Sequence, residues 1–322
     1  MTERGNGLPT YDQLPVREGA PAHSSWGVFG DDDQVGTVNL LDTEKVLAAV
    51  GLVRRGQVFS LNWDLEQPDP PLAGRRALAH TIHRGPIGTD DYYDTFYTQR
   101  SSQWDSLSHV QHPTHGFYNG CSLDDITGRP GSRNGIDNWA RRGVVGRFVL
   151  VDVARHRERS GEALDQKSAE PIGVDELVAT LAEQKTSLGP GDILLLRFGW
   201  MAWYEAAGIE DRLYAARAPE EIGTPGLAHE EEVARWLWDE HVAAVATDSP
   251  ALEVLPVDQT SAEKFLHIRL IPLLGIAIGE MFQLEDLAAD CAEDGVYEGL
   301  FTAAPLNKTG GSGSPANALA IK

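Results

Sequence analysis

Three short runs of apolar residues constrain the fold more than any other feature of the sequence. They cover residues 143–153, 193–197 and 241–248. Uninterrupted apolar runs of this length are typical of strands that are buried on both faces of a sheet. Segments with helical spacing, 174–181 and 230–238, precede the second and the third run. The alternation of helices with buried strands predicts an α/β fold.

The two ends of the chain differ in composition from its middle. The chain has 322 residues, which is long for one domain, although α/β domains often reach this size. We expect one large domain over residues 26–305. Residues 1–25 are rich in Gly, Pro and polar residues without periodicity, which predicts an arm that is disordered or lies across another subunit. Residues 306–322 are expected to form a C-terminal tail, flexible because 310–317 is rich in Gly and Ser.

The charge balance excludes some partners. The chain has 27 basic and 48 acidic side chains and a net charge of −21. Such a surface repels phosphate backbones and anionic lipids at long range, so we expect neither nucleic acid nor a membrane as a partner. Net charge does not describe a single cleft, and a local basic pocket can still bind an anionic substrate.

Cysteine content and the N-terminus indicate the compartment. Cys121 and Cys291 are too few for a disulfide framework or a thiolate zinc site, and we expect two free thiols. The first residues lack the apolar region of a signal peptide, and no run approaches the roughly 18 apolar residues that a membrane span needs. These features predict a cytoplasmic protein.

The residues best suited to chemistry lie in the segment 101–110. Asp105 and His109 stand four residues apart among serines, which suits an acid/base pair or a pair of metal ligands. An aromatic-rich stretch leads to this segment, and its side chains are predicted either to fill the core or to line a pocket for a planar substrate. It consists of Tyr92, Tyr93, Phe96, Tyr97 and Trp104. Trp104 is the strongest pocket candidate, although a regular strand would turn it away from Asp105.

Four further histidines are weaker candidates. His80 and His83 have β-branched neighbours, which favour a strand that sends the two side chains to opposite faces. His112 and His115 lie in a loop marked by Pro and Gly. Either one can serve as an additional metal ligand, or both are simply exposed.

The segment 99–109 resembles the signature of the cyclase or kynurenine formamidase-like hydrolase family, roughly His-x-Gly-Thr-His-x-Asp-x-Pro-x-His. Asp105 and His109 match its Asp and its last His. Gln99 and Gln103 stand where the family has two metal-binding histidines, and Leu107 replaces its Pro. Other segments that resemble the family are 189–200, 224–227, 247–250 and 267–280, and together they place the resemblance over residues 26–305.

The resemblance implies a mixed β-sheet or barrel-like core with surrounding helices, and hydrolysis of a small-molecule amide, cyclic or aryl-linked, or of a lactone. His109 would carry a proton between water and the leaving group. Asp105, His267 and Glu280 would bind one divalent ion, Mn²⁺ or Zn²⁺. Trp104 and Tyr118 are expected to contact the substrate. The family also implies a homo-oligomer.

Replacement of two imidazoles by amides leaves other functions open. Without a metal, Gln99 and Gln103 would donate hydrogen bonds to the substrate carbonyl. Asp105, His109 and Glu280 would then move protons in a lyase, a dehydratase or a ring-forming cyclase. A binding protein without catalytic activity is the remaining alternative.

Overall fold

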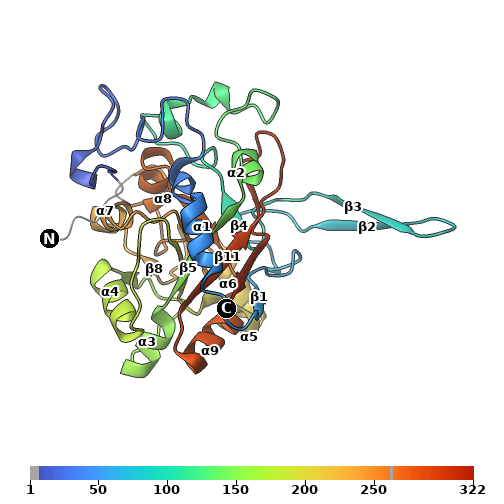
Figure 1. Cartoon of the computed structure of the whole chain (residues 1–322). Helices are drawn as coiled ribbons and strands as arrows, with labels where there is room; N and C mark the ends of the chain where they lie inside the picture. Colours follow the sequence, from blue (N-terminus) through green and yellow to red (C-terminus); the bar gives the residue numbers. More distant parts are fainter. Residues whose placement is uncertain (1–6, 262–263) are drawn as a thin grey trace.

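A mixed nine-stranded β-sheet forms the centre of the computed structural model, which describes residues 7–261 and 264–322 (Figure 1). Its strands follow the order β1-β13-β11-β5-β7-β9-β10-β4-β12. They are β1 (Val58–Ser60), β4 (Gln103–Asp105), β5 (Val144–Asp152), β7 (Ile193–Arg197), β9 (Ala244–Thr247), β10 (Ala277–Glu280), β11 (Glu298–Ala303), β12 (Gly313–Pro315) and β13 (Ala318–Ile321). The predicted mixed α/β fold is confirmed.

The four central strands, β5, β7, β9 and β10, run parallel to one another. All residues of β7, β9 and β10 are buried, as expected for strands covered on both faces. The three apolar runs of the sequence thus become β5, β7 and β9. Antiparallel strands flank this group on both sides, β11 next to β5 and β4 next to β10.

Helices surround the sheet, and α1 packs against β5 and β11. The α-helices are α1 (Thr43–Val50), α2 (Asp137–Arg142), α3 (Val153–Ser160), α4 (Val174–Glu183), α5 (Trp200–Ala206), α6 (Ile209–Ala215), α7 (Glu231–Asp239), α8 (Leu266–Ile268) and α9 (Glu285–Asp294). Short 3₁₀ turns occur at η1 (Tyr11–Gln13), η2 (Gly36–Leu40), η3 (Tyr118–Gly120) and η4 (Leu123–Asp125), and a π turn at η5 (Arg269–Leu273). No helix in the described ranges is long and apolar enough to cross a membrane.

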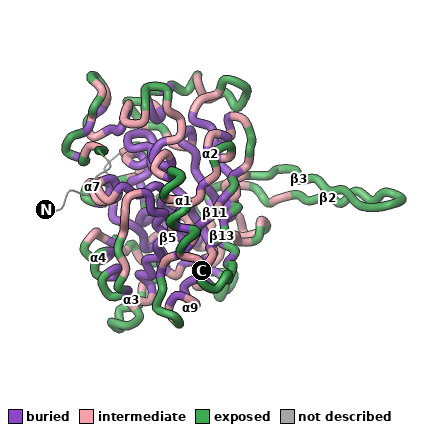
Figure 2. The backbone as a smooth tube through the Cα atoms, viewed as in Figure 1, coloured by how far each residue is buried: buried purple, intermediate pink, exposed green. Residues whose placement is uncertain are grey.

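The hairpin of β2 (Ala79–Arg84) and β3 (Thr89–Asp94) projects from the body of the molecule (Figure 1). Every residue of both strands is exposed, and the hairpin stands apart from the buried core in Figure 2. Tyr92 and Tyr93 therefore lie neither in the core nor at a pocket wall, so both readings of the aromatic stretch are wrong for these two residues. A separate two-stranded sheet joins β6 (Pro171–Ile172) to β8 (Gly226–Leu227).

The structure corrects the predicted flexible tail and the reading of residues 7–25 as disordered, while contact of the arm with another subunit stays a prediction. Residues 7–25 lie on their own chain: the backbone N–H of Tyr11 donates to Asp239 at 2.7 Å, and the Arg235 guanidinium lies 4.7 Å from the Tyr11 ring centre. Residues 1–6 of the predicted arm lie outside the described ranges. The predicted flexible tail instead supplies β12, which pairs with β4, and β13, which pairs with β1 and β11. These backbone hydrogen bonds hold it in the sheet.

Candidate metal and active site

The pairing of β4 with β10 brings together two segments that are distant in the sequence. Their antiparallel register places Gln103 opposite Glu280 and Asp105 opposite Ile278. Side chains alternate along a strand, so Gln103 and Asp105 point to one face of the sheet while Trp104 points to the other. The segment 101–110 therefore meets the segment 267–280 at one edge of the parallel strands.

Asp105, His267 and Glu280 form a compact buried cluster. Each offers one ligand atom, and these atoms lie within 4.8 Å of one another. Nε2 of His267, on α8, lies 3.2 Å from Oε1 of Glu280 and 3.6 Å from Oδ2 of Asp105. This Oδ2 is buried without a hydrogen-bond partner among the described residues. Two carboxylates and an imidazole fit a divalent cation such as Mn²⁺ or Zn²⁺, and a bound cation would satisfy Oδ2 of Asp105.

Glu253 orients the imidazole of the cluster. Its Oε2 lies 2.6 Å from Nδ1 of His267, and its Oε1 accepts the backbone N–H of His267 at 3.1 Å. With Nδ1–H donated to Glu253, Nε2 is the ring nitrogen that faces Asp105 and Glu280 and that a cation would engage in place of a proton. A carboxylate behind a ligating histidine is a common feature of metal sites. Glu253 was not among the residues predicted from the sequence, although a lone acid between Leu252 and Val254 is a signal for a buried functional carboxylate.

The electrostatic field of the cluster is negative. Burial alone would lower the pKa of His267, but Glu253, Asp105 and Glu280 outweigh it and raise this pKa well above its usual value. Burial would raise the pKa of Asp105, yet His109, His267 and Gln99 together lower it to about 2. Burial and the charge of Asp105 raise the pKa of Glu280 despite its contact with His267. Three buried carboxylates in contact with one imidazole favour positive charge at their centre.

Two glutamine side chains hold these carboxylates in place. Nε2 of Gln99 donates to Oδ1 of Asp105 and lies 3.0 Å from Nδ1 of His109. Nε2 of Gln103 donates to Oε2 of Glu280 at 2.6 Å. Gln99 fits there because Gly313 of β12 has no side chain; a Cβ atom at Gly313 would lie 2.6 Å from the Gln99 side chain.

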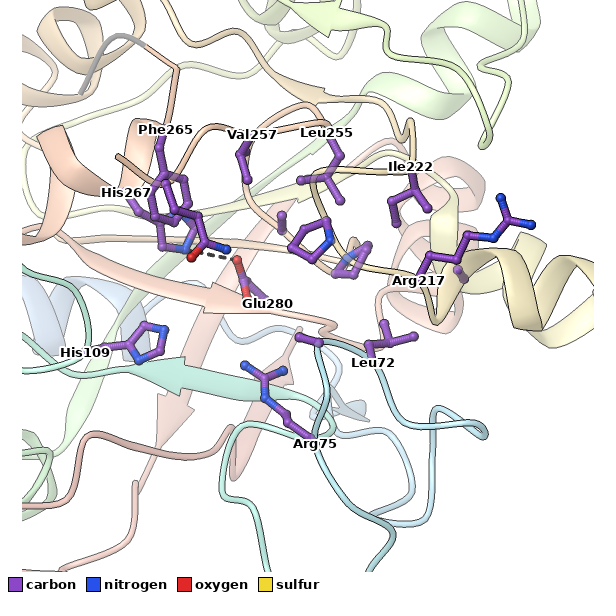
Figure 3. A pocket seen from close by; sticks show the side chains of 16 residues that line it. Leu72, Arg75, His109, Arg217, Ile222, Leu255, Val257, Phe265, His267 and Glu280 are labelled. Atoms are coloured by element: carbon purple, nitrogen blue, oxygen red, sulfur yellow. Dashed lines mark ion pairs between the residues drawn. The ribbon is translucent and has the colours of Figure 1, made fainter. Parts of the chain in front are cut away.

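A pocket opens beside the cluster, and Figure 3 shows His109, His267 and Glu280 along one end of it. Much of the remaining wall is apolar. The lining residues are Leu72, Ala73, Arg75, His109, Ala215, Arg217, Pro219, Ile222, Pro250, Ala251, Leu255, Val257, Gln259, Phe265, His267 and Glu280. The His109 side chain is 29% exposed, whereas the Asp105 side chain is 1% exposed. A ligand in the pocket therefore reaches His109 directly.

The comparisons with known proteins place the chain in a family. The family model described as a putative cyclase matches residues 38–254, about two thirds of the chain. The crystal structure of a novel cyclase is 33% identical, with a TM-score of 0.81, over 93% of this chain and 99% of the other. The chain belongs to the cyclase family. None of the curated proteins that were compared matches it.

More distant relatives share the cyclase fold alone. Isatin hydrolase A from Labrenzia aggregata, bound to benzyl benzoate, is 17% identical with a TM-score of 0.58, over 82% of this chain and 93% of its own. An isatin hydrolase bound to the product analogue thioisatinate is 16% identical with a TM-score of 0.56, over 87% of this chain and 95% of its own. Membership of the cyclase family suggests an enzyme.

Not every predicted site residue of this cyclase-family chain lies at the pocket. Trp104 is fully buried, and its ring packs edge-on against Trp139, Phe282 and Phe301. Tyr118 is also fully buried, and its hydroxyl donates to Asp33 at 3.1 Å. These contacts contradict the predicted substrate contacts of Trp104 and Tyr118, because β4 points Trp104 into the core and Tyr118 packs beneath Gly275.

The glutamines need a second correction. Gln99 and Gln103 were expected to donate to a substrate carbonyl, but their amide N–H groups point to Asp105 and Glu280 instead. Neither glutamine is among the residues that line the pocket. Their contacts support positioning of the two carboxylates rather than contact with the substrate.

The remaining histidines lie outside the buried cluster. His80 and His83 alternate along β2, as predicted, and His80 lies 2.9 Å from Asp91. His112 and His115 are neighbours, with ring centres 4.4 Å apart in their loop. None of these four is part of the Asp105, His267 and Glu280 group.

Replacement of Glu253 by glutamine is expected to weaken metal binding roughly 10–100-fold. A glutamine cannot accept from both N–H groups of His267, so the imidazole is driven to the tautomer that carries its proton on Nε2. The dissociation constant for Mn²⁺ or Zn²⁺, measured by competition with a chromophoric chelator, tests this. Glu230→Gln, at an exposed position, is the control. Equal affinities in both variants would show that Glu253 does not orient the ligand.

Proposed function

We propose that the chain is a metal-dependent hydrolase that cleaves an amide or lactone bond of a small molecule. The observation that carries the proposal is the position of His109 beside the buried group of Asp105, His267 and Glu280, at the end of an apolar pocket. The shared fold with isatin hydrolases supports the reaction class. In this reaction the oxygen of water bonds to the carbonyl carbon, the C–N or C–O bond breaks, and the leaving atom takes a proton.

Asp105, His267 and Glu280 would hold the ion, with Glu253 behind His267. When bound, a divalent ion polarises the scissile carbonyl and lowers the pKa of a water molecule. The carboxylates of the cluster repel other negative groups from the space between them, so the substrate would enter from the apolar side of the pocket.

His109 is the residue that would move the proton. Burial lowers the pKa of its imidazole, and the charges of His267 and Arg75 oppose the effect of Asp105. The ring is held at Nδ1 by Gln99, and its Nε2 lies 3.7 Å from Oδ1 of Asp105. The His109 imidazole is the group at the pocket wall that is suited to carry a proton between water and the leaving group.

The deciding experiment combines metal analysis with a substrate panel. Purified protein is expected to contain close to one equivalent of Mn²⁺ or Zn²⁺ per chain, and turnover of a member of a panel of cyclic amides, aryl amides and lactones should be lost after chelation. Readdition of the ion should restore it. Turnover that persists in metal-free protein would overturn the proposal.

A second candidate is a metal-free lyase, dehydratase or ring-forming cyclase. It is favoured by Gln99 and Gln103, which occupy positions where the resembled family signature has imidazoles. In this version Asp105, His109 and Glu280 move protons without adding water. Its products would lack oxygen from solvent, so mass spectrometry of a reaction in H₂¹⁸O separates it from hydrolysis.

We also propose that the chain forms homo-oligomers through the β2–β3 hairpin. An isolated two-stranded ribbon is at best marginally stable in water, and this one exposes Ile82, Tyr92 and Tyr93. A second copy suits this surface because each copy carries the same exposed hairpin, and a symmetric contact can cover both hairpins. Light scattering should show a dimer or larger species, and Ile82→Ser with Tyr92→Ser should shift it toward monomer. Leu47→Ser, at an exposed position on α1, should not; a monomeric parent protein would contradict the proposal.

A further inference from the structure

Arg75 lines the pocket without an acidic partner, whereas several arginines elsewhere in this acidic chain are paired. Arg147 contacts Asp192 and Glu298, Arg197 contacts Asp152 and Glu285, and Arg157 contacts Glu176. Within residues 7–261 and 264–322, the Arg75 side chain has no acidic partner and no hydrogen bond; only its backbone N–H is engaged, with Leu72 at 3.1 Å. The side chains of Arg76 and Arg84 also lack an acidic partner among the described residues, but neither lines the pocket, so Arg75 is distinguished by its position there.

The loop before β2 holds Arg75 at the pocket. Leu72 is buried against Trp200, Met201 and Tyr204, which anchors the loop three residues before Arg75. The Arg100 guanidinium donates to the backbone carbonyl oxygens of Glu66 at 2.5 Å and Pro68 at 3.2 Å and fixes the earlier part of the loop. Arg75 lines the pocket, and Figure 3 shows its guanidinium turned toward the side where His109 and Glu280 lie.

The opposite wall of the pocket is apolar. Ile222, Leu255 and Val257 form one packed cluster, and Phe265 packs against it. The second arginine at the pocket, Arg217, points away from it in Figure 3 and lies 5.5 Å from the ring centre of Tyr214. The pocket thus combines an apolar wall with one inward guanidinium close to the proton-carrying histidine.

We infer that Arg75 binds an acid group of the substrate, which makes the substrate class a small carboxylic acid with an apolar or aromatic body. The inference rests on the proposed function, because that function places the reacting carbonyl beside His109. A guanidinium offers two parallel N–H donors that match a carboxylate. Without this cation, the carboxylates of Asp105, Glu253 and Glu280 would repel an anionic ligand from the pocket. The apolar wall would hold the body, and the acid group would lie on the side of the reacting bond.

The test compares two ligands of nearly equal shape, benzoate and benzamide, of which only the first is charged at pH 7. Their dissociation constants are measured by surface plasmon resonance on metal-loaded protein. We expect benzoate to bind more tightly than benzamide, and Arg75→Gln to weaken benzoate roughly tenfold or more while leaving benzamide unchanged. Arg75→Lys keeps the charge but loses the paired donors, so its affinity for benzoate should lie between those of the parent protein and Arg75→Gln. Arg76→Gln, an exposed neighbour that does not line the pocket, should retain the preference.

The readout is a ratio of two affinities, so a general loss of folding cannot imitate the expected result. A preference for benzoate that survives in Arg75→Gln but disappears on chelation would mean that the acid group binds the metal, and the inference would be wrong. Absence of benzoate binding up to 20 mM (about the weakest affinity that one ion pair with a carboxylate should give) would also overturn it. The measurement needs no turnover, so its result stands apart from the test of hydrolysis.

Discussion

Replacement of His267 by alanine is expected to remove the metal ion and to lower the free energy of unfolding by about 3–5 kcal/mol. The imidazole contacts Glu253, Glu280 and Asp105, and all three carboxylates are buried. Removal of the imidazole leaves their negative charges without the partner that balances them. Metal content by mass spectrometry and unfolding in guanidinium chloride, each compared with the parent protein, measure the two effects.

His115→Ala is the matched control, because His115 lies in an exposed loop outside the cluster. It should retain both metal and stability. A His267→Ala protein that still binds one equivalent of metal would exclude His267 as a ligand. A loss of metal without a loss of stability would instead indicate that the carboxylates take up protons when the imidazole is absent.

The buried strands could be predicted from the sequence because each depends on local composition. The run 143–153 becomes β5, and the run 193–197 becomes β7 with the same bounds. The predicted flexible tail was wrong for a related reason: Gly and Ser are common both in flexible linkers and where strands lie close together. Gly313 is of the second kind, since it leaves space for Gln99. Composition alone does not distinguish the two cases.

The candidate site could be predicted only where a resemblance supplied long-range information. Asp105, His267 and Glu280 were named from the resemblance, and the structure brings them together. Glu253 and Arg75 reach the site through loops whose course depends on tertiary packing, and no spacing rule connects them to His267 or His109. Trp104 was misplaced although the necessary rule was available, because alternation along β4 sends it away from Asp105.

Replacement of His109 by alanine is expected to lower turnover roughly 10²–10⁴-fold, the usual contribution of a positioned acid/base residue. The substrate is whichever member of the amide and lactone panel the parent protein hydrolyses. Metal content should stay unchanged, because His109 is outside the ligand group. The unfolding midpoint should change little, since 29% of the side chain is exposed and no helix or strand depends on it.

This combination of outcomes separates proton transfer from a structural role. His112→Ala, three residues further along the chain, is the control and should retain full turnover, because His112 does not line the pocket. Addition of free imidazole should restore part of the activity of His109→Ala, since the side chain leaves a space open to solvent. Full turnover by His109→Ala would instead transfer the acid/base role to Glu280, whose pKa is raised by burial and by the charge of Asp105. Glu280 would then act as a base, and the proposed ligand set would lose one of its two carboxylates.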